Sequence, residues 1–210
     1  MDLVDRWVAL AGPQTRRIGT ELDARYGEGH RRYHTREHLA AVLDLVDELA
    51  AHALLAERDA DTVRLAAWFH DAVYEPERAD NEERSARLAG RMLADTDLAE
   101  DVVAEVVRLV ELTVTHAPAA DDRNGQVLCD ADLAILGSEP ERYAAYAVAV
   151  REEYAFVPED LFRVGRAEVL GGLLALPALF HTPLARERFE ARARRNIETE
   201  LMLLKAVPPS

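Results

Sequence analysis

The sequence predicts an all-α protein, and three observations lead to this prediction. Apolar residues recur every three or four positions along most of the 210-residue chain, which is the period of an amphipathic helix. Aromatic residues make up only 6% of the composition, and proline and glycine fall mainly between the periodic stretches. No alternating strand pattern competes with this. Because no contrast in composition divides the chain, we expect one domain spanning 1–210.

Each expected helix is identified by an apolar stripe and by the polar or proline residues at its ends. The clearest stripes run through 39–49, 63–73 and 102–114. Thr35 and Asp61 are expected to cap the helices that follow them, and Asp80 with Glu83 forms a capping-box pattern. We expect eight or nine helices, in the segments 2–25, 36–56, 61–74, 81–95, 98–115, 127–137, 140–155, 159–175 and 184–205.

Charge and cysteine usage narrow the classes of protein to which this chain can belong. The formal net charge of −14 argues against a nucleic-acid surface, which normally needs a clustered basic face. Cys129 is the single cysteine, so no intrachain disulfide forms and a reducing compartment is expected. The N-terminus lacks a basic signal-peptide start, and no apolar run approaches the roughly 18 residues of a membrane span. We therefore expect a cytoplasmic protein with neither nucleic-acid nor membrane partners.

Widely separated histidine and aspartate residues are candidate metal ligands. They are His38, the adjacent pair His70 and Asp71, and one aspartate of the segment that contains Asp130 and Asp132. Imidazole nitrogen and carboxylate oxygen bind divalent ions such as Mn, Fe, Co, Ni, Mg and Zn. Helical phase places Asp132 on the more apolar stripe, where an aspartate needs a cation or hydrogen-bond donors beside it. Asp130 stays in reserve, with an interaction at the helix N-terminus as its alternative role.

The order of these residues resembles the H…HD…D signature of the HD superfamily of metal-dependent phosphohydrolases. The flanking segments are also similar to a group of predicted HD phosphohydrolases of bacteria. These segments are RRYHTREHL, WFHDAVYEPERADNEERSA, LTVTH, CDADLAILG, REEY and VGRAEVL. The likeness extends from about residue 30 to about residue 201. The HD dipeptide alone is a weak signal, whereas the ordered set of segments is specific.

The resemblance implies an HD-like helical bundle with a metal centre. It would comprise an N-terminal helix within 1–27, a metal-binding core over about 30–137 and C-terminal helices within 140–205. One divalent ion, identified no further than Mn, Ni, Co, Fe, Mg or Zn, would be held by four residues, and a second ion is left open. The implied ligands are His38, His70, Asp71 and Asp132, with Asp130 as the reserve ligand.

Three residues are candidates for the catalytic work. Asp71 would orient the attacking water as well as bind the ion, and Glu82 or His116 would handle protons. Each of the last two has an ordinary alternative. Glu82 lies where exposed glutamates are common in a first helical turn, and His116 lies where a histidine can interact with free helix carbonyls.

Five further residues are candidates for substrate binding. Tyr33 and His34 precede the first ligand helix and either overhang the pocket or simply cover the core. Ser85 shares a helix face with the candidate base. Arg151 and Arg166 are candidate phosphate ligands, because lysine is nearly absent, although each could equally form a surface ion pair.

Together these features predict a metal-dependent phosphohydrolase that uses water to cleave a small phosphate ester or phosphoanhydride, such as a nucleotide. Two alternatives stay open. One is a di-iron oxygenase of HD type, in which additional histidines hold a second iron. The other is a non-catalytic module that binds a metal or a nucleotide. A homodimer also stays open, because apolar helix faces can pack against a second copy.

Overall fold

The computed structural model describes residues 2–206, which form helices and their connections with no β-strand among them. The first residue of the expected N-terminal segment and the last four residues, 207–210, lie outside this range. The α-helices are α1 (Leu3–Ala11), α2 (Arg16–Tyr26), α3 (Arg36–His52), α4 (Glu57–Phe69), α5 (Asn81–Leu93), α6 (Glu100–Leu112), α7 (Arg123–Leu133), α8 (Pro140–Glu153), α9 (Glu159–Ala175), α10 (Pro183–Ala185) and α11 (Ala191–Ala206). Between them lie two 3₁₀-helices, η1 (Pro13–Thr15) and η2 (Ala134–Gly137), and a π-helical segment, η3 (Arg186–Glu190).

The all-α prediction is confirmed, but the described helices are somewhat more numerous than eight or nine. The expected helix 2–25 divides at Gly12, whose φ of 91° lies in the left-handed region, and at Pro13. The chain then folds back so that α2 packs on α1. A Cβ atom at Gly19 would lie 2.5 Å from the Trp7 ring, so this close approach requires glycine.

The expected helix caps are only partly present. Thr35 occupies the N-cap position of α3, but its side chain makes no capping hydrogen bond. Asp61 lies inside α4, which begins four residues earlier at Glu57. The capping box is wrong, because the Asp80 carboxylate binds the Arg78 guanidinium at 2.7 and 2.9 Å instead of the helix amides.

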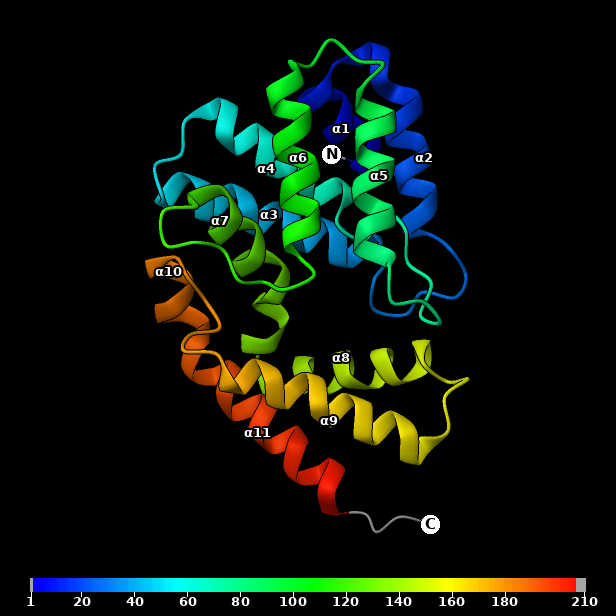
Figure 1. The fold of residues 1–210 in the computed structure, drawn as a ribbon, viewed down its shortest axis with the longest axis vertical. Helices are drawn as coiled ribbons and strands as arrows, with labels where there is room; N and C mark the ends of the chain where they lie inside the picture. Colours follow the sequence, from blue (N-terminus) through cyan, green and yellow to red (C-terminus); the bar gives the residue numbers. More distant parts are fainter. Residues whose placement is uncertain (1, 207–210) are drawn as a thin grey trace.

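Helix α4 lies at the centre of the larger group of helices. It contacts α1, α3, α5, α6 and α7, which surround it in the upper part of Figure 1. Its last turn is fully buried, and the Trp68 ring meets the Trp7 ring edge-on at a centroid distance of 5.4 Å. A helix enclosed in this way holds its C-terminal residues in fixed positions, and the histidine–aspartate pair follows directly after it.

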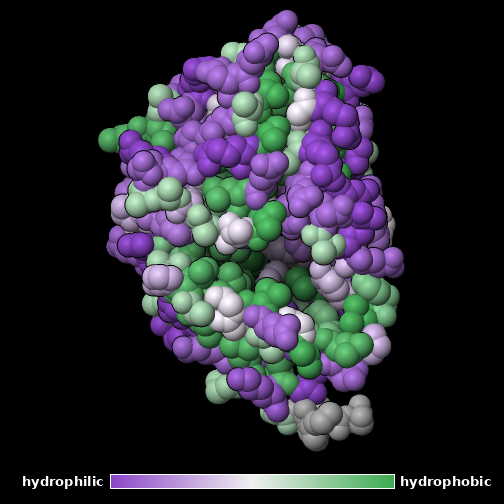
Figure 2. All heavy atoms as spheres, in the orientation of Figure 1, coloured by the Kyte–Doolittle hydropathy of each residue, from purple (hydrophilic) through white to green (hydrophobic). Residues whose placement is uncertain are grey.

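Helices α8, α9 and α11 form the lower part of the molecule, with the C-terminal end of α11 farthest from the N-terminus (Figure 1). The connection between the parts runs through α7 and η2, and η2 packs on α11. The buried hydrophobic cluster includes residues from Trp7 to Ile197, so both parts contribute to it. Figure 2 shows a hollow between the two parts, bordered by hydrophobic side chains. No helix in the described range combines the length and apolar character needed to cross a membrane.

Candidate metal centre

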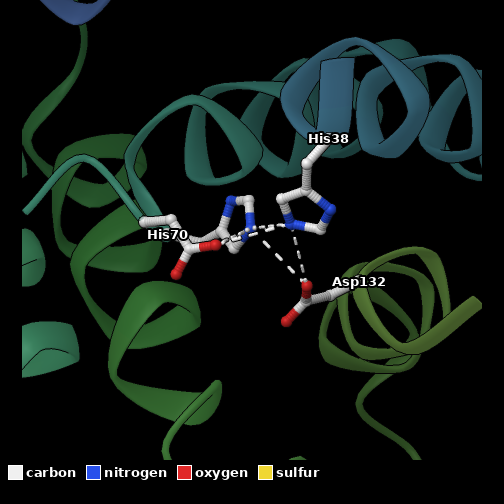
Figure 3. A group of neighbouring side chains, drawn as sticks. His38, His70 and Asp132 are labelled. Carbon is white, nitrogen blue, oxygen red and sulfur yellow. Dashed lines mark hydrogen bonds and ion pairs between the residues drawn. The ribbon is translucent and has the colours of Figure 1, made fainter. Parts of the chain in front are cut away.

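Four side chains from separate parts of the chain converge below the end of α4. His38 comes from α3, His70 and Asp71 follow α4, and Asp132 comes from the last turn of α7. Figure 3 shows His38, His70 and Asp132 pointing toward one another. One ligand atom from each of the four residues lies within 4.8 Å of the others. This group could hold a metal ion.

The individual distances show how closely the ligand atoms approach. The Nε2 atoms of His38 and His70 are 3.0 Å apart. An Asp71 oxygen lies 3.4 Å from His38 Nε2 and 3.1 Å from His70 Nε2. An Asp132 oxygen lies 3.4 and 3.5 Å from the same two nitrogens. Two nitrogens and two oxygens therefore surround one small volume.

The backbone around His70 fixes the orientation of its ring. His70 is the C-cap residue of α4, and its Nδ1 lies 2.7 Å from the Ala67 carbonyl oxygen. Because a carbonyl only accepts, Nδ1 carries the proton, and the lone pair of the neutral ring lies on Nε2. The same bond satisfies a free carbonyl at the end of the helix. His70 therefore presents Nε2 to the centre as a metal ligand would.

Asp71 is held by its backbone as well as by its side-chain contacts. Its amide N–H donates to the Tyr26 hydroxyl at 3.3 Å, and its carbonyl accepts from the Arg31 guanidinium at 2.8 Å. The fully buried Arg31 side chain also binds the His34 carbonyl at 3.1 Å. Arg31 thus ties the segment before α3 to the segment after α4, which aligns His38 with the histidine–aspartate pair.

Burial and charge act in opposite directions on the titration of the cluster. Burial alone would lower the pKa of His70, but the carboxylates of Asp71 and Asp132 outweigh it and raise that pKa well above its usual value. Burial would raise the pKa of Asp71, yet His70 and the neighbouring histidines hold it well below the usual range. The pKa of Asp132 is lowered well below normal in the same way. The histidines and the aspartates of the cluster therefore shift one another's pKa values in opposite directions.

The donor set fits a divalent cation. With both rings neutral, two imidazole nitrogens and two carboxylates carry two negative charges, which match the charge of one such ion. Nitrogen and oxygen donors suit Mn, Fe, Co, Ni and Zn, and they do not select one of these metals. Four protein ligands leave one or two positions of a five- or six-coordinate ion for water or substrate.

Asp130 is turned away from this cluster. One of its oxygens accepts the His181 amide N–H and the other accepts the Thr182 amide N–H, each at 2.7 Å. Burial raises the pKa of this carboxyl group, and the two amide bonds oppose that shift. Asp130, the reserve candidate, therefore fastens the segment before α10 to α7, and Asp132 is the aspartate of α7 that belongs to the group that could hold a metal ion.

His116 lies behind the ligand cluster. Its Nε2 is 2.8 Å from the second oxygen of Asp132, the oxygen that does not face the other histidines. The residue has a φ of 49°, an uncommon left-handed conformation for a side chain other than glycine. This turn after α6 directs the ring toward Asp132. His116 can therefore orient a ligand, donate a proton or bind a second ion.

A cavity of about 540 Å³ opens beside the ligands. Its walls include the expected metal ligand Asp132 and six of the eight expected catalytic and substrate-binding residues, namely Tyr33, His34, Asp71, Glu82, His116 and Arg166. Burial raises the pKa of Glu82, and the nearby Asp71 charge adds to the effect. The far wall is formed by apolar side chains of η2 and α9, and this is the hollow in Figure 2.

Two expected substrate-binding residues lie elsewhere. Ser85 is fully buried, and its hydroxyl accepts from the Val73 amide N–H at 3.0 Å, which fixes the loop after the ligand pair. Arg151 binds the carbonyl oxygens of Tyr154 and Val157 at 2.6 and 3.0 Å, which closes the turn after α8. Neither residue lines the cavity beside the ligands. The Ser85 hydroxyl is bound to the Val73 backbone. The Arg151 guanidinium is bound to carbonyl groups that follow α8.

Glu153 is a residue of the site region that sequence reasoning did not single out. One oxygen accepts the amide N–H groups of Arg32, Tyr33 and His34 at 2.7 to 3.0 Å. The other oxygen contacts His34 Nδ1 at 2.7 Å and accepts the Tyr74 hydroxyl at 2.9 Å. Glu153 belongs to the REEY segment, in which only the arginine had been considered, but nothing in that segment shows which amides its carboxylate would meet.

A scan against protein-family models and searches of the curated proteins and the solved structures each found no match to this chain. The function is therefore inferred from the side chains of the site.

Proposed function

We propose that this protein is a metal-dependent phosphohydrolase of HD type, which uses water to cleave a phosphate ester or phosphoanhydride bond in a small molecule such as a nucleotide. The observation that carries the proposal is the convergence of His38, His70, Asp71 and Asp132 within 4.8 Å at the wall of a cavity. A purely structural metal site is usually closed by protein ligands, whereas this group borders open space.

Each residue of the cluster has a defined task in this proposal. A divalent ion bound by the four ligands would lower the pKa of a coordinated water and polarise a phosphoryl oxygen. Asp71 lies at both the ligand cluster and the cavity wall, so its carboxylate can orient the attacking water. Glu82 can accept the proton of that water, because burial raises the pKa of its carboxyl group toward a useful range. His116 holds Asp132 in place through its free oxygen.

The cavity has room for the organic part of a substrate. Its volume of about 540 Å³ lies within the usual range for small-molecule sites. Tyr33 and Tyr146 meet edge-on at 4.6 Å at one side, and Arg166 lies over the Tyr146 ring. Leu173 of α9 and Leu176, which directly follows that helix, form part of the opposite apolar wall. A substrate would fill the cavity if its phosphate lay near the metal ligands and its planar or apolar group lay against α9.

The test begins with metal removal and reconstitution. The protein is treated with EDTA, reloaded separately with Mn, Ni, Co, Mg or Zn, and assayed for phosphate release from a panel of nucleotides and phosphate monoesters. We expect turnover with at least one metal and its loss in the variants His70→Ala and Asp71→Asn. His52→Ala is the matched control, because His52 is an exposed histidine at the end of α3. Full activity of both site variants would disprove the proposal.

A di-iron oxygenase is the second candidate, because the cavity contains two additional histidines. His34 lines it from one side, and His116 lies 2.8 Å from Asp132. Two tightly bound irons per chain together with substrate-dependent consumption of O₂ would favour this function. One ion per chain with phosphate release would favour hydrolysis.

A further inference from the structure

A second cavity lies apart from the metal centre, between α2 and α5. It has a volume of about 430 Å³, and its lining residues are all different from those of the cavity beside the ligands. Residues 72–75 form its floor, and they follow the ligand Asp71 directly in the chain. The cavity therefore has its own walls and its own chemistry.

The walls of this cavity are rich in arginine. Arg84, Arg87 and Arg91 occur at spacings of three and four on α5, so they project from one face of that helix. Arg25 faces them from α2, and His30 adds an imidazole. Four guanidinium groups thus border one small space in a chain with a net charge of −14. Like charges gathered in this way repel one another unless carboxylates or a bound anion offset them.

Several donors of these arginines lack an acceptor. Arg25 Nε and Arg84 Nη1 are buried and have no hydrogen-bond partner. Among the described residues, Arg91 forms no ion pair within 4.0 Å. Buried donors without acceptors are uncommon in proteins and indicate a bound group or water. Here they belong to side chains that line the same cavity.

Acidic side chains nearby neutralise only part of this charge. Glu75 binds Arg84 at 2.8 Å, and Glu28 is bound by the buried Arg31 at 3.1 Å. Outside the cavity, Glu21 binds the terminal nitrogen of Arg25 at 2.9 Å and leaves its Nε free. Glu83 lies 3.5 Å from Arg87 on the exposed surface. Three of the four guanidinium groups therefore have a carboxylate within 4.0 Å, whereas Arg91 has none among the described residues, and the buried Arg25 Nε and Arg84 Nη1 still lack an acceptor.

We propose that the arginine-lined cavity between α2 and α5 is a second ligand site, which binds a small polyanion that carries phosphate groups. Guanidinium groups suit phosphate because their planar fork donates two parallel hydrogen bonds to it. The volume admits a diphosphate-sized group, whereas a macromolecule would need a larger surface. This site is independent of the metal centre and does not depend on hydrolysis.

Binding of inorganic pyrophosphate to the full chain in EDTA, measured by isothermal titration calorimetry, tests the proposal. We expect one pyrophosphate per chain, with equal affinity in the wild type and in His70→Ala, because the metal ligands take no part. The double variant Arg87→Ala/Arg91→Ala should bind about tenfold more weakly, since it loses charge-assisted hydrogen bonds at a partly exposed site. Arg58→Ala/Arg195→Ala removes the same charge from exposed positions outside the cavity and should bind like the wild type.

Three results would overturn the proposal: no binding of pyrophosphate by the wild type, equal weakening in both double variants, or loss of binding in His70→Ala. Circular dichroism checks that each variant is folded. If the double variant is unstable, the single change Arg91→Glu on the exposed rim provides the same test. It reverses one charge without removing an observed ion pair, and retained pyrophosphate affinity in this variant would also contradict the proposal.

Discussion

Asp130 and Asp132 lie two residues apart on α7, and their surroundings could hardly differ more. Asp130 accepts two backbone amide N–H groups, so each oxygen has a neutral donor that the fold supplies permanently. Asp132 has imidazole rings around it, with His116 on one oxygen and His38 and His70 near the other. Both carboxylates are largely removed from water, which makes compensation of their charge necessary.

The kind of compensation separates the two roles. Amide donors belong to the backbone and cannot be exchanged for a metal ion, so Asp130 stabilises a connection between α7 and α10. Histidine rings can lose their protons and become ligands themselves, so the surroundings of Asp132 can rearrange around a cation. A buried carboxylate bound only by amides is therefore structural, whereas one among histidines is a candidate ligand.

The largest expected difference between the two aspartates is in activity. Under the proposed function, Asp132→Asn removes a negatively charged ligand, and we expect hydrolysis to fall on the order of 10³-fold, because the ion would be bound more weakly and its water would be less acidic. Metal content after dialysis measures the weaker binding of the ion. Phosphate release at saturating metal measures the effect on the bound water. Circular dichroism should show a folded protein. Wild-type activity in this variant would show that Asp132 is not a metal ligand needed for hydrolysis.

Asp130→Asn should show the opposite behaviour, with a large loss of stability and retained metal binding. The asparagine amide has one carbonyl oxygen, so its NH₂ group would face a backbone N–H where the second carboxylate oxygen now accepts. We expect a loss of roughly 3–4 kcal/mol in the free energy of unfolding, as for a broken buried charged network. Urea unfolding measures this loss. If metal content fell instead and stability did not change, Asp130 would have to be counted as a ligand.

Glu153 is a third buried carboxylate, and it has both backbone amides and a histidine as partners. Burial would raise its pKa, but His34 and the backbone amides lower that pKa to about 2, below the ordinary value of 4.5. A carboxyl with a depressed pKa in the folded state stabilises the protein above the unfolded pKa, and that contribution is lost as pH falls from 4.5 toward 2. The shift corresponds to about 3 kcal/mol of stability at neutral pH.

Glu153→Gln tests this pH dependence. We expect the gap in the free energy of unfolding between wild type and variant to be about 3 kcal/mol at pH 6 and to narrow toward pH 3. Urea titrations at several pH values measure it. Glu152→Gln is the matched control, since its neighbouring carboxylate is exposed and lies 3.7 Å from Arg32. A gap that does not change with pH would show that hydrogen-bond geometry, and not charge, sets the role of Glu153.

The fold was predictable where the apolar pattern is long and uninterrupted. The stripe through 39–49 predicts α3, and the one through 102–114 predicts most of α6. The division at Gly12 was missed because apolar residues continue on both sides of it. Asp80 occupies the N-cap position of α5 without a capping hydrogen bond, because Arg78 binds its carboxylate, and sequence spacing does not show this ion pair.

The site was predictable to the extent that helical phase reports burial. Phase favoured Asp132, and Asp132 does belong to the group that could hold a metal ion, although Asp130 is the more deeply buried of the two. Ser85 lies on a buried face as well, but phase cannot show that the Val73 backbone occupies its hydroxyl. The part played by Glu153 depends on three consecutive amides brought to it from more than a hundred residues away, and no local pattern contains such information.

Glu82 provides the smallest expected effect, because among the described residues its carboxylate has no arginine or histidine partner and hydrogen-bonds only with its own backbone amide. Its pKa is raised by burial and by the charge of Asp71, as expected for a group that exchanges protons with water in the cavity.

We expect Glu82→Gln to lower kcat roughly 10- to 100-fold with little change in stability. The acid limb of the pH profile, where the wild-type carboxylate becomes protonated, should disappear in the variant. Glu83→Gln alters the exposed neighbour and should leave both kcat and the profile unchanged. An acid limb that persists in Glu82→Gln would assign proton transfer to another group, with His116 as the next residue to replace.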